Sequence, residues 1–299
     1  MEAYNQEPIQ VIKAKHKEVS VFSTDVENID AKVVEGFGEE WSRFNNFDED
    51  TFKKMVSLYF DILDDKIVNK NSYAIDIGCG TGRQSKHIAK IAKFVECVDP
   101  SKAIYAADVM LKDANNVRLT QASTESLPFP DETFDFAMSI GVLHHIPNTE
   151  KAMMDCVKKV KKGGYFYCYL YYNLDNRSFL YKLLFQASHL VRLLVSRLPN
   201  GIKKVVCDIL AVVLYMPWVL LARFFVLIGM RNFAKKIPLA AYEDKSFFVI
   251  RNDSLDRFGT SLEQRFSKKE VFEMMTRCGL TDIVISPKTP YYHAVGKRI

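Results

Sequence analysis

The sequence predicts an α/β protein with a doubly wound, mostly parallel sheet, helices on both of its faces and an inserted all-α cap. The first observation is a short apolar segment with one acid, Ala74–Ile77, that leads into a glycine-rich turn and a helix. The second is that apolar runs and helical segments then alternate over residues 71–172, as they do in parallel sheets. The third is an apolar and basic stretch, 173–262, that separates this part from the last helix and strands, 263–299.

The composition is that of an ordinary globular protein. Hydrophobic residues make up 48% and charged residues 26% of the 299 residues, and the net charge of +5 is mild. No basic arm or zinc-ligand pattern stands out, so we expect neither a nucleic-acid partner nor a metal site. The six cysteines form no Cys-x-x-Cys pair, and the first thirty residues are polar. We therefore expect reduced thiols, no signal peptide and a cytoplasmic location.

Residues 1–70 are predicted to form a helical preface to the core. The segment Phe52–Val68 carries apolar residues at helical spacing, and Trp41 lies ahead of it, within Phe37–Phe44. One interpretation is that the preface closes over a ligand, with Trp41 lining the substrate site. The alternative is that Trp41 only anchors the preface on the core.

The stretch Asp76–Gly82 (Asp-Ile-Gly-Cys-Gly-Thr-Gly) is an acid followed by glycines at alternate positions. Such glycines permit positive φ angles and close approach of a ligand, and the next helix directs its N–H groups to the same place. A dinucleotide fingerprint would need glycine where Arg83 stands, and the Gly-Lys-Ser/Thr of a P-loop is absent. The acid favours a ligand that carries an amine and a sulfonium over one that carries a pyrophosphate.

A second apolar run, Phe94–Val98, also ends at an acid, Asp99. A carboxylate at this position can accept hydrogen bonds from both hydroxyls of a ribose. Asp99 could equally cap the helix that begins near Pro100 and Ser101, and the two roles are compatible.

Together with the later segments 117–139, 141–146 and 161–168, these motifs resemble class I S-adenosylmethionine-dependent methyltransferases, in their small-molecule, type-11-like group. The resemblance covers about residues 70–172 and implies a Rossmann-like sheet of seven strands with an antiparallel last strand. It implies S-adenosylmethionine as cofactor and S-adenosylhomocysteine as product. Where many members have Asp, this chain has Ser123, so a hydroxyl and the backbone of Thr124 would contact the adenine. The cofactor residues implied are Asp76, Gly78, Cys79, Gly80, Gly82, Asp99, Pro100, Ser123, Thr124 and Ile140.

The acceptor side is expected just after the fourth and fifth core strands. His144 and His145 follow the fourth, and either could act as a catalytic base near neutral pH. Alternatively, one of them packs into the sheet or caps a helix. Tyr171, Tyr172 and Asn173 follow the fifth strand and are candidates to line the substrate, although tyrosine is also common in strands.

The insert, 173–262, has an unusual centre. From 176 to 236 there are ten basic residues and one acid, and the apolar run Ile209–Met230 is broken only by Pro217 and Arg223. The run is long enough to span a bilayer, but one span would put the two halves of the core on opposite sides. A re-entrant pair or an in-plane helix avoids this contradiction. The earlier stretch, 179–198, is amphipathic with Lys and Arg on its polar side, as expected of a helix on an anionic membrane surface. The alternatives are a cap over the active site and the interface of a homodimer.

The final segment, 263–299, closes the core. Ser267 and Glu270 predict a capping box, with a helix to about Arg277 that stops at Gly279. Two strands are expected after it, over 282–286 and 292–296.

The sequence thus predicts a cytoplasmic methyltransferase that acts by in-line displacement. Its insert would either bind the cytoplasmic face of a membrane or serve as a cap or dimer interface. We expect its acceptor to be an oxygen of a small or amphiphilic molecule such as a lipid or lipid-linked sugar. A soluble metabolite or sugar is the alternative acceptor. A non-catalytic membrane adaptor that kept the cofactor pocket is the alternative from another class.

Overall fold

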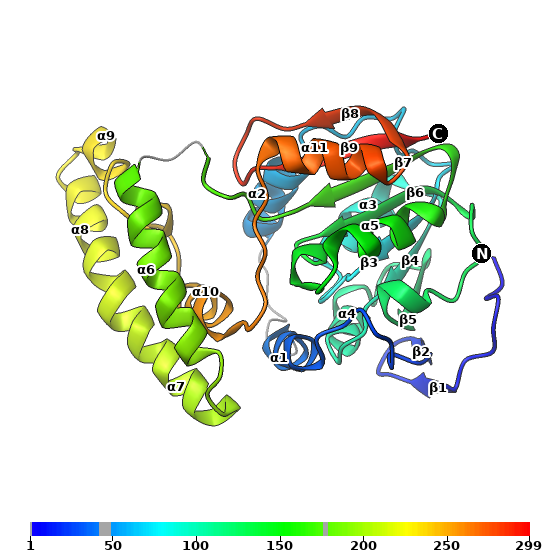
Figure 1. Cartoon of the computed structure of the whole chain (residues 1–299), viewed down its shortest axis with the longest axis horizontal. Coiled ribbons are helices and arrows are strands. Elements are labelled where there is room, and N and C mark those ends of the chain that lie inside the picture. Colours follow the sequence, from blue (N-terminus) through cyan, green and yellow to red (C-terminus); the bar gives the residue numbers. More distant parts are fainter. Residues whose placement is uncertain (1, 42–48, 176–178) are drawn as a thin grey trace. The chain divides into compact units, whose positions relative to one another are not determined.

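The computed structural model describes residues 2–41, 49–175 and 179–299. The chain divides into two compact units (Figure 1). Unit 1 combines Met1–Asp175 with Leu262–Ile299, and unit 2 is Asn176–Ser261. The predicted insert, 173–262, contains all of unit 2.

Unit 1 is built on one sheet of nine strands among the described residues, in the order β1-β2-β5-β4-β3-β6-β7-β9-β8. Neighbours from β2 to β7 run parallel, whereas β1, β9 and β8 pair antiparallel with their neighbours. The α/β class and the mostly parallel order are thereby confirmed. The strands are β1 Gln10–Lys13, β2 Glu18–Val21, β3 Tyr73–Ile77, β4 Phe94–Val98, β5 Val117–Gln121, β6 Phe134–Ile140, β7 Val160–Tyr169, β8 Leu280–Ile285 and β9 His293–Arg298.

Helices cover both faces of the sheet (Figure 1). Apolar side chains of α2, α3 and α4 share one core cluster with Ala74 of β3, while those of α5 and α11 share the other with Ile75 and Ile77. Because successive strand residues face opposite sides and both faces are covered, every residue of β3 is buried, and all but Asp76 are apolar. The helices of unit 1 are α1 Ala31–Trp41, α2 Glu49–Tyr59, α3 Arg83–Ile91, α4 Ile104–Met110, α5 Thr149–Lys158 and α11 Lys268–Arg277.

The structure differs from the prediction of a helical preface over 1–70 and a seven-stranded sheet in two respects. The preface begins with a hairpin, β1–β2, which extends the sheet because Val19 of β2 pairs with Leu119 of β5 and is fully buried. The helix expected over 52–68 ends at Tyr59. The Asp64 carboxylate accepts backbone hydrogen bonds from Lys66 and Ile67, and this local turn competes with a continued helix.

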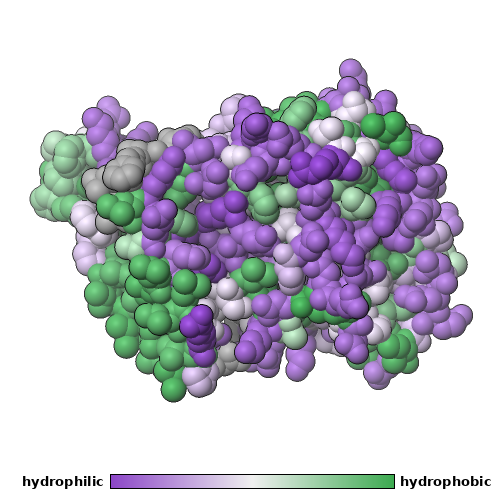
Figure 2. Space-filling view, viewed as in Figure 1, coloured by the Kyte–Doolittle hydropathy of each residue, from purple (hydrophilic) through white to green (hydrophobic). Residues whose placement is uncertain are grey.

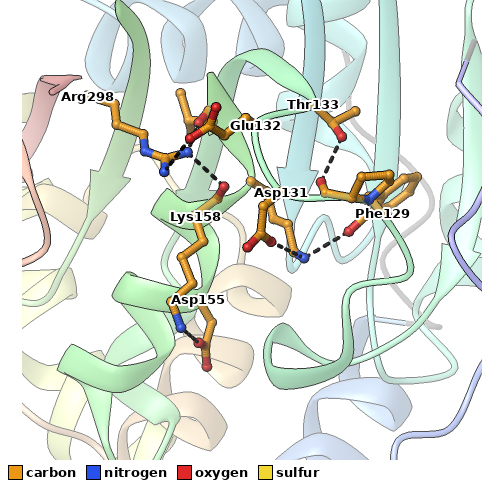
Figure 3. Close-up of polar contacts among 10 residues, drawn as sticks. Phe129, Asp131, Glu132, Thr133, Asp155, Lys158 and Arg298 are labelled. Carbon is orange, nitrogen blue, oxygen red and sulfur yellow. Dashed lines mark hydrogen bonds and ion pairs between the residues drawn. The ribbon is translucent and has the colours of Figure 1, made fainter. Parts of the chain in front are cut away.

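The loop before β6 is braced from two directions (Figure 3). Lys159 Nζ donates to the Phe129 carbonyl at 2.8 Å and to Asp131 Oδ1 at 2.7 Å. Arg298 at the end of β9 donates to the Lys158 carbonyl at 2.8 Å and to Glu132 at 3.2 Å. These contacts tie the last strand to the end of the sheet that lies away from the carboxyl ends of the parallel strands.

The closing elements follow their sequence signals. Ser267 and Glu270 form the capping box at the start of α11, which ends at Arg277 before Gly279 with φ 84°. Strand β8 begins at Leu280, two residues before the predicted start, and β9 occupies 293–298 rather than 292–296.

Unit 2 is helical throughout its described residues and has a small core of its own. Along the continuous helix Gly201–Leu227, buried residues recur every four positions, at Cys207, Ala211, Tyr215 and Val219. They pack with buried residues of α10, among them Ile250. The unit comprises α6 Phe179–Val195, α7 Asn200–Leu210, the π-helical turn η3 Ala211–Tyr215, α8 Met216–Leu227, α9 Arg231–Ala234, the 3₁₀ turn η4 Ala240–Tyr242 and α10 Phe247–Gly259.

Helices α7 and α8 are continuous through η3. Over Gly201–Leu227 this is one helix long and apolar enough to cross a membrane, by length and composition alone, and a single helix of this kind is weak evidence of a span. Pro217 is accommodated because it lies in the first turn of α8, directly after the π-helical turn.

Because each unit has a core of its own, we predict that unit 1 folds without unit 2. Replacing 176–261 by a flexible linker of about ten Gly and Ser residues should leave one cooperative thermal transition, followed by circular dichroism. The same linker in place of 94–110 removes β4 and α4 and should abolish the transition. Loss of the transition in the first variant would show that unit 1 depends on unit 2.

Candidate cofactor and acceptor site

The candidate site lies at the carboxyl ends of β3, β4 and β6. Successive strands proceed outward from β3 through β4 to β5 on one side and from β6 to β7 on the other. The strand order therefore reverses between β3 and β6, which is where open α/β sheets bind their ligands.

The turn after β3 depends on three glycines in the left-handed region. Gly78, Gly80 and Gly82 have φ values of 79°, 54° and 77°. A Cβ on Gly78 would lie 2.4 Å from Val142 Cγ2, and one on Gly82 would lie 2.9 Å from Leu111 Cδ1. A Cβ on Gly80 would meet nothing within 4 Å. Gly78 and Gly82 are therefore needed for packing, whereas the backbone at Gly80 is open to the approach of a ligand.

Asp99 joins this turn to the end of β4. Its Oδ2 accepts the Gly80 N–H at 2.9 Å, and its Oδ1 accepts hydrogen bonds from the backbone and the hydroxyl of Ser101, at 2.8 and 2.6 Å. Burial raises the pKa of Asp99, and the hydrogen bonds from Ser101 and Gly80 oppose that rise. Asp99 thus holds the next segment, beginning at Pro100, and a carboxylate oxygen with a remaining lone pair can still accept a hydrogen bond from a ligand.

Asp76, near the end of β3, is 1% exposed. Its Oδ2 accepts a hydrogen bond from Ser85 Oγ at 2.6 Å, and its Oδ1 has no partner among the described residues. Burial raises its pKa to about 7, with a further contribution from Asp99 and an opposing one from Ser85. The hydroxyl of Thr81 is likewise buried and lacks a partner within the described part of the chain. Unpaired buried acceptors are costly, and a ligand with positive charge and donor groups would satisfy them.

The other residues predicted for the cofactor lie on the same sheet edge. Cys79 is buried in the turn, and its N–H donates to the Val98 carbonyl at 2.9 Å. Ser123 and Thr124 follow β5, and the Ser123 hydroxyl already shares a 3.0 Å hydrogen bond with Ser126. Ile140 is the last residue of β6 and is 9% exposed. Among the described residues no hydrogen bond joins Ser123 to the glycine turn, so its role stays a prediction.

His144 and His145 end the 3₁₀ turn η2, Leu143–His145, after β6. His145 Nδ1 lies 2.7 Å from the Leu262 carbonyl, which can only accept, so this nitrogen carries the proton. His144 is fully buried, and neither of its ring nitrogens has a partner among the described residues. Burial, followed by the nearby His145 and Arg265, lowers the pKa of His144 well below its ordinary value and keeps the ring neutral.

The predicted substrate-lining residues separate into two groups. The Tyr171 ring stacks on His144 with centroids 3.9 Å apart. Tyr172 instead packs with Tyr291 and Tyr292 on the opposite face of the sheet, and the Asn173 N–H donates to the Phe266 carbonyl. Grouping Tyr172 with Tyr171 was wrong because consecutive residues in an extended chain point to opposite faces.

Trp41 is the last residue of α1, and its side chain lies outside the described residues. Two neighbours of the histidine pair were missed by sequence reasoning. The Phe37 ring of α1 lies 4.8 Å from that of His145, and the Arg265 guanidinium lies 5.1 Å from the Tyr171 ring centre. Both residues are far from the motifs along the chain, so no local signal marked them. Among the described residues, no cluster of three or more His, Cys, Asp or Glu side chains could hold a metal ion.

Comparison with known proteins adds to this geometry. Residues 75–168 match a family described as a methyltransferase domain. The chain is 30% identical to a sterol 4-C-methyltransferase of Caenorhabditis elegans over 119 residues, 38% of this chain and 36% of that protein. It is 26% identical to a ubiquinone biosynthesis O-methyltransferase of Coxiella burnetii over 154 residues, 47% of this chain and 63% of that protein. The matched parts thus span about one third to two thirds of these relatives.

Among solved structures, a methyltransferase from Thermotoga maritima, described as a possible histamine N-methyltransferase, shares 18% identity and a TM-score of 0.42. The likeness covers 83% of this chain and 89% of that one. The family match and the strand order assign residues 75–168 to the methyltransferase domains of class I. The cofactor of this class of domain is S-adenosylmethionine, which carries a sulfonium, an amine and a ribose.

The residues present fit this cofactor. The unpaired Asp76 oxygen suits a cationic ligand, and the open backbone at Gly80 admits one. Asp99, fixed by Gly80 and Ser101, is a ready acceptor for ribose hydroxyls. No group in this set requires a phosphate.

We predict that Gly78→Ala destabilises unit 1 more than Gly80→Ala. Both replacements put a side chain at positive φ, at a cost of about 1–2 kcal/mol. Only Gly78→Ala adds a clash with Val142, which raises the total by about 1–3 kcal/mol. Urea unfolding of the ligand-free variants measures the free energy of unfolding of each. Equal decreases for Gly78→Ala and Gly80→Ala would contradict the described packing of the turn.

Proposed function

We propose that the chain is an S-adenosylmethionine-dependent methyltransferase acting on a small-molecule acceptor. The observation that carries this proposal is the hydrogen-bonded link between Asp99 and the Gly80 N–H. It supports the proposal because it holds the Asp99 carboxylate, a suitable acceptor for ribose hydroxyls, beside the open backbone at Gly80. The alternative of a non-catalytic adaptor would not need a buried Asp76 oxygen without a partner among the described residues.

The protein's contribution is positioning. When bound, the cofactor supplies an electrophilic methyl group on a sulfonium. Asp76 would bind the cationic amino-acid part, and Asp99 would fix the ribose. Holding donor and acceptor in line removes most of the entropic barrier to a displacement of this kind.

On the acceptor side we propose His145 as the base for an oxygen acceptor. Because its Nδ1–H donates to the Leu262 carbonyl, the lone pair of the neutral ring is on Nε2. The buried His144 is a poorer base because its pKa is depressed, and with Tyr171 it would shape the wall of the acceptor site.

The acceptor we favour is amphiphilic, such as a lipid or a lipid-linked sugar. The two relatives above are named for a sterol and for ubiquinone biosynthesis, and both names indicate apolar acceptors. A soluble metabolite or sugar remains the alternative acceptor. All six cysteines are buried thiols rather than halves of disulfides, which supports a cytoplasmic location.

Cofactor affinity should depend on the protonation of Asp76. Because the pKa of Asp76 is about 7 without ligand, its carboxyl is largely neutral at pH 6 and ionised at pH 8. Binding of the cationic cofactor should therefore tighten as pH rises, by up to about tenfold per unit below the pKa. The same shift makes the ligand-free fold less stable as pH rises from about 4 to 7, since the native state favours the neutral carboxyl.

Isothermal titration of S-adenosylmethionine between pH 6 and 8 measures this dependence. The matched variant Asp76→Asn should bind more weakly and show a flatter pH profile. An Asp99→Ala variant should lose affinity at every pH. A pH-independent affinity in the wild type, or wild-type affinity in Asp99→Ala, would contradict the assignment of these carboxylates.

Transfer of labelled methyl from S-adenosylmethionine into cell extract tests the reaction itself. We expect label in the organic phase, whereas label in the aqueous phase would favour a soluble acceptor. His145→Gln should lower the rate by about 100-fold or more without changing S-adenosylhomocysteine affinity, since it removes only the base. Tyr172→Phe is the control and should retain activity. No transfer by the wild type would favour the adaptor.

A further inference from the structure

Unit 2 exposes an apolar helix face that its own core does not use. The face runs along the continuous helix of α7, η3 and α8, and each of its members is more than half exposed. Their spacing of mostly three and four residues puts them on one side of the helix. The members of this apolar face are Ile202, Val205, Ile209, Val212, Val213, Leu220, Phe224 and Leu227.

The opposite side of the same helix packs against other helices of unit 2. Cys207, Ala211 and Tyr215 pack into the core of unit 2. Ser254 of α10 donates to the Cys207 carbonyl at 2.7 Å, and Tyr215 donates to Asp253 at 3.1 Å. The apolar face is therefore a second surface, and Figure 2 shows hydrophobic side chains gathered over this part of the chain.

The charge around the apolar face is positive. Lys203 and Lys204 lie near the start of the helix, and Arg231, Lys235 and Lys236 are exposed beyond its end. The one acid between positions 176 and 236, Asp208, is neutralised by Arg251, whose Nε lies 2.7 Å from Asp208 Oδ1.

The one charged side chain within the apolar run of α8 does not interrupt the face. Arg223 donates to the backbone carbonyls of Glu243 and Lys245, at 2.8 and 2.7 Å. The guanidinium is thereby held against unit 2 itself.

We propose that this apolar face inserts in the plane of an anionic lipid leaflet, with the flanking lysines and arginines on the lipid headgroups. The apolar face would contact the acyl chains near the headgroup boundary, and the basic residues at its ends would contact the anionic headgroups. A second copy of this chain fits less well, because apposing two such faces would bring rims of like charge together. The proposal is independent of catalysis, since lipid binding requires only unit 2.

The helix would lie along the leaflet rather than cross it. Helix α10 packs beside α7 and η3 and carries charged residues along its length, including Arg251, Asp253 and Asp256. A spanning helix would take these ionisable groups into hydrocarbon, where charged side chains cost about 2.5–3.5 kcal/mol or more each. An in-plane helix leaves them in water on the side away from the lipid.

Co-sedimentation of the full chain with vesicles tests the proposal. The vesicles are phosphatidylcholine alone or mixed with phosphatidylglycerol. We expect the wild type to pellet with the mixed vesicles and more weakly with the neutral ones. The double variant Ile209→Glu/Val213→Glu should bind about tenfold more weakly or worse, because it charges the inserted face. The triple variant Arg231→Gln/Lys235→Gln/Lys236→Gln should lose binding to the anionic vesicles by about tenfold or more.

Phe272→Glu is the matched control, since it charges an exposed apolar residue of α11 in unit 1 and should pellet like the wild type. All positions changed are exposed, so the thermal transition temperatures of the variants should equal that of the wild type. If the double variant has a lowered transition, the single Val213→Glu takes its place. No pelleting by the wild type would overturn the proposal. So would a dimer that Val213→Glu dissociates, or membrane-bound protein that alkaline carbonate does not extract, since these indicate a copy–copy interface and a span.

Discussion

The site depends above all on one hydrogen bond, from the Gly80 N–H to Asp99 Oδ2 at 2.9 Å. Parallel pairing of β3 with β4 brings the two strand ends to the same edge of the sheet, and this bond then fixes the glycine turn against the second strand. The turn can accept it only because its glycines occupy the left-handed region. The positions of Asp76, Val142 and the start of α3 all follow from the shape of this turn.

Ionisation of a buried carboxylate in the ligand-free site is unfavourable, and a cationic ligand would offset this free-energy cost. Burial makes the ionisation of Asp76 unfavourable, the nearby Asp99 adds to this cost, and one Asp76 oxygen has no partner among the described residues. Such an arrangement persists where function requires it, because elsewhere an apolar side chain would be more stable. A cationic ligand supplies the missing partner, which is why the same buried acids that weaken the ligand-free fold strengthen binding.

Much of this could be predicted from the sequence, because the strongest signals are local. The glycine turn, Asp99 and the Ser267–Glu270 capping box each occupy a few consecutive residues and appear as expected. The hairpin β1–β2 was missed because its short strands are stabilised by pairing with β5, a contact made across the fold. The contact of Arg265 with Tyr171 was missed for the same reason, and the division of Tyr171 from Tyr172 required the strand register.

The central claim is that the turn at 78–82 and Asp99 hold S-adenosylmethionine. Ultraviolet crosslinking of labelled S-adenosylmethionine, followed by mapping of the labelled peptide, tests it most directly. The account predicts label within residues 73–105 or 120–145, removed by excess S-adenosylhomocysteine. Label confined to other segments, or label that the competitor does not displace, would contradict it.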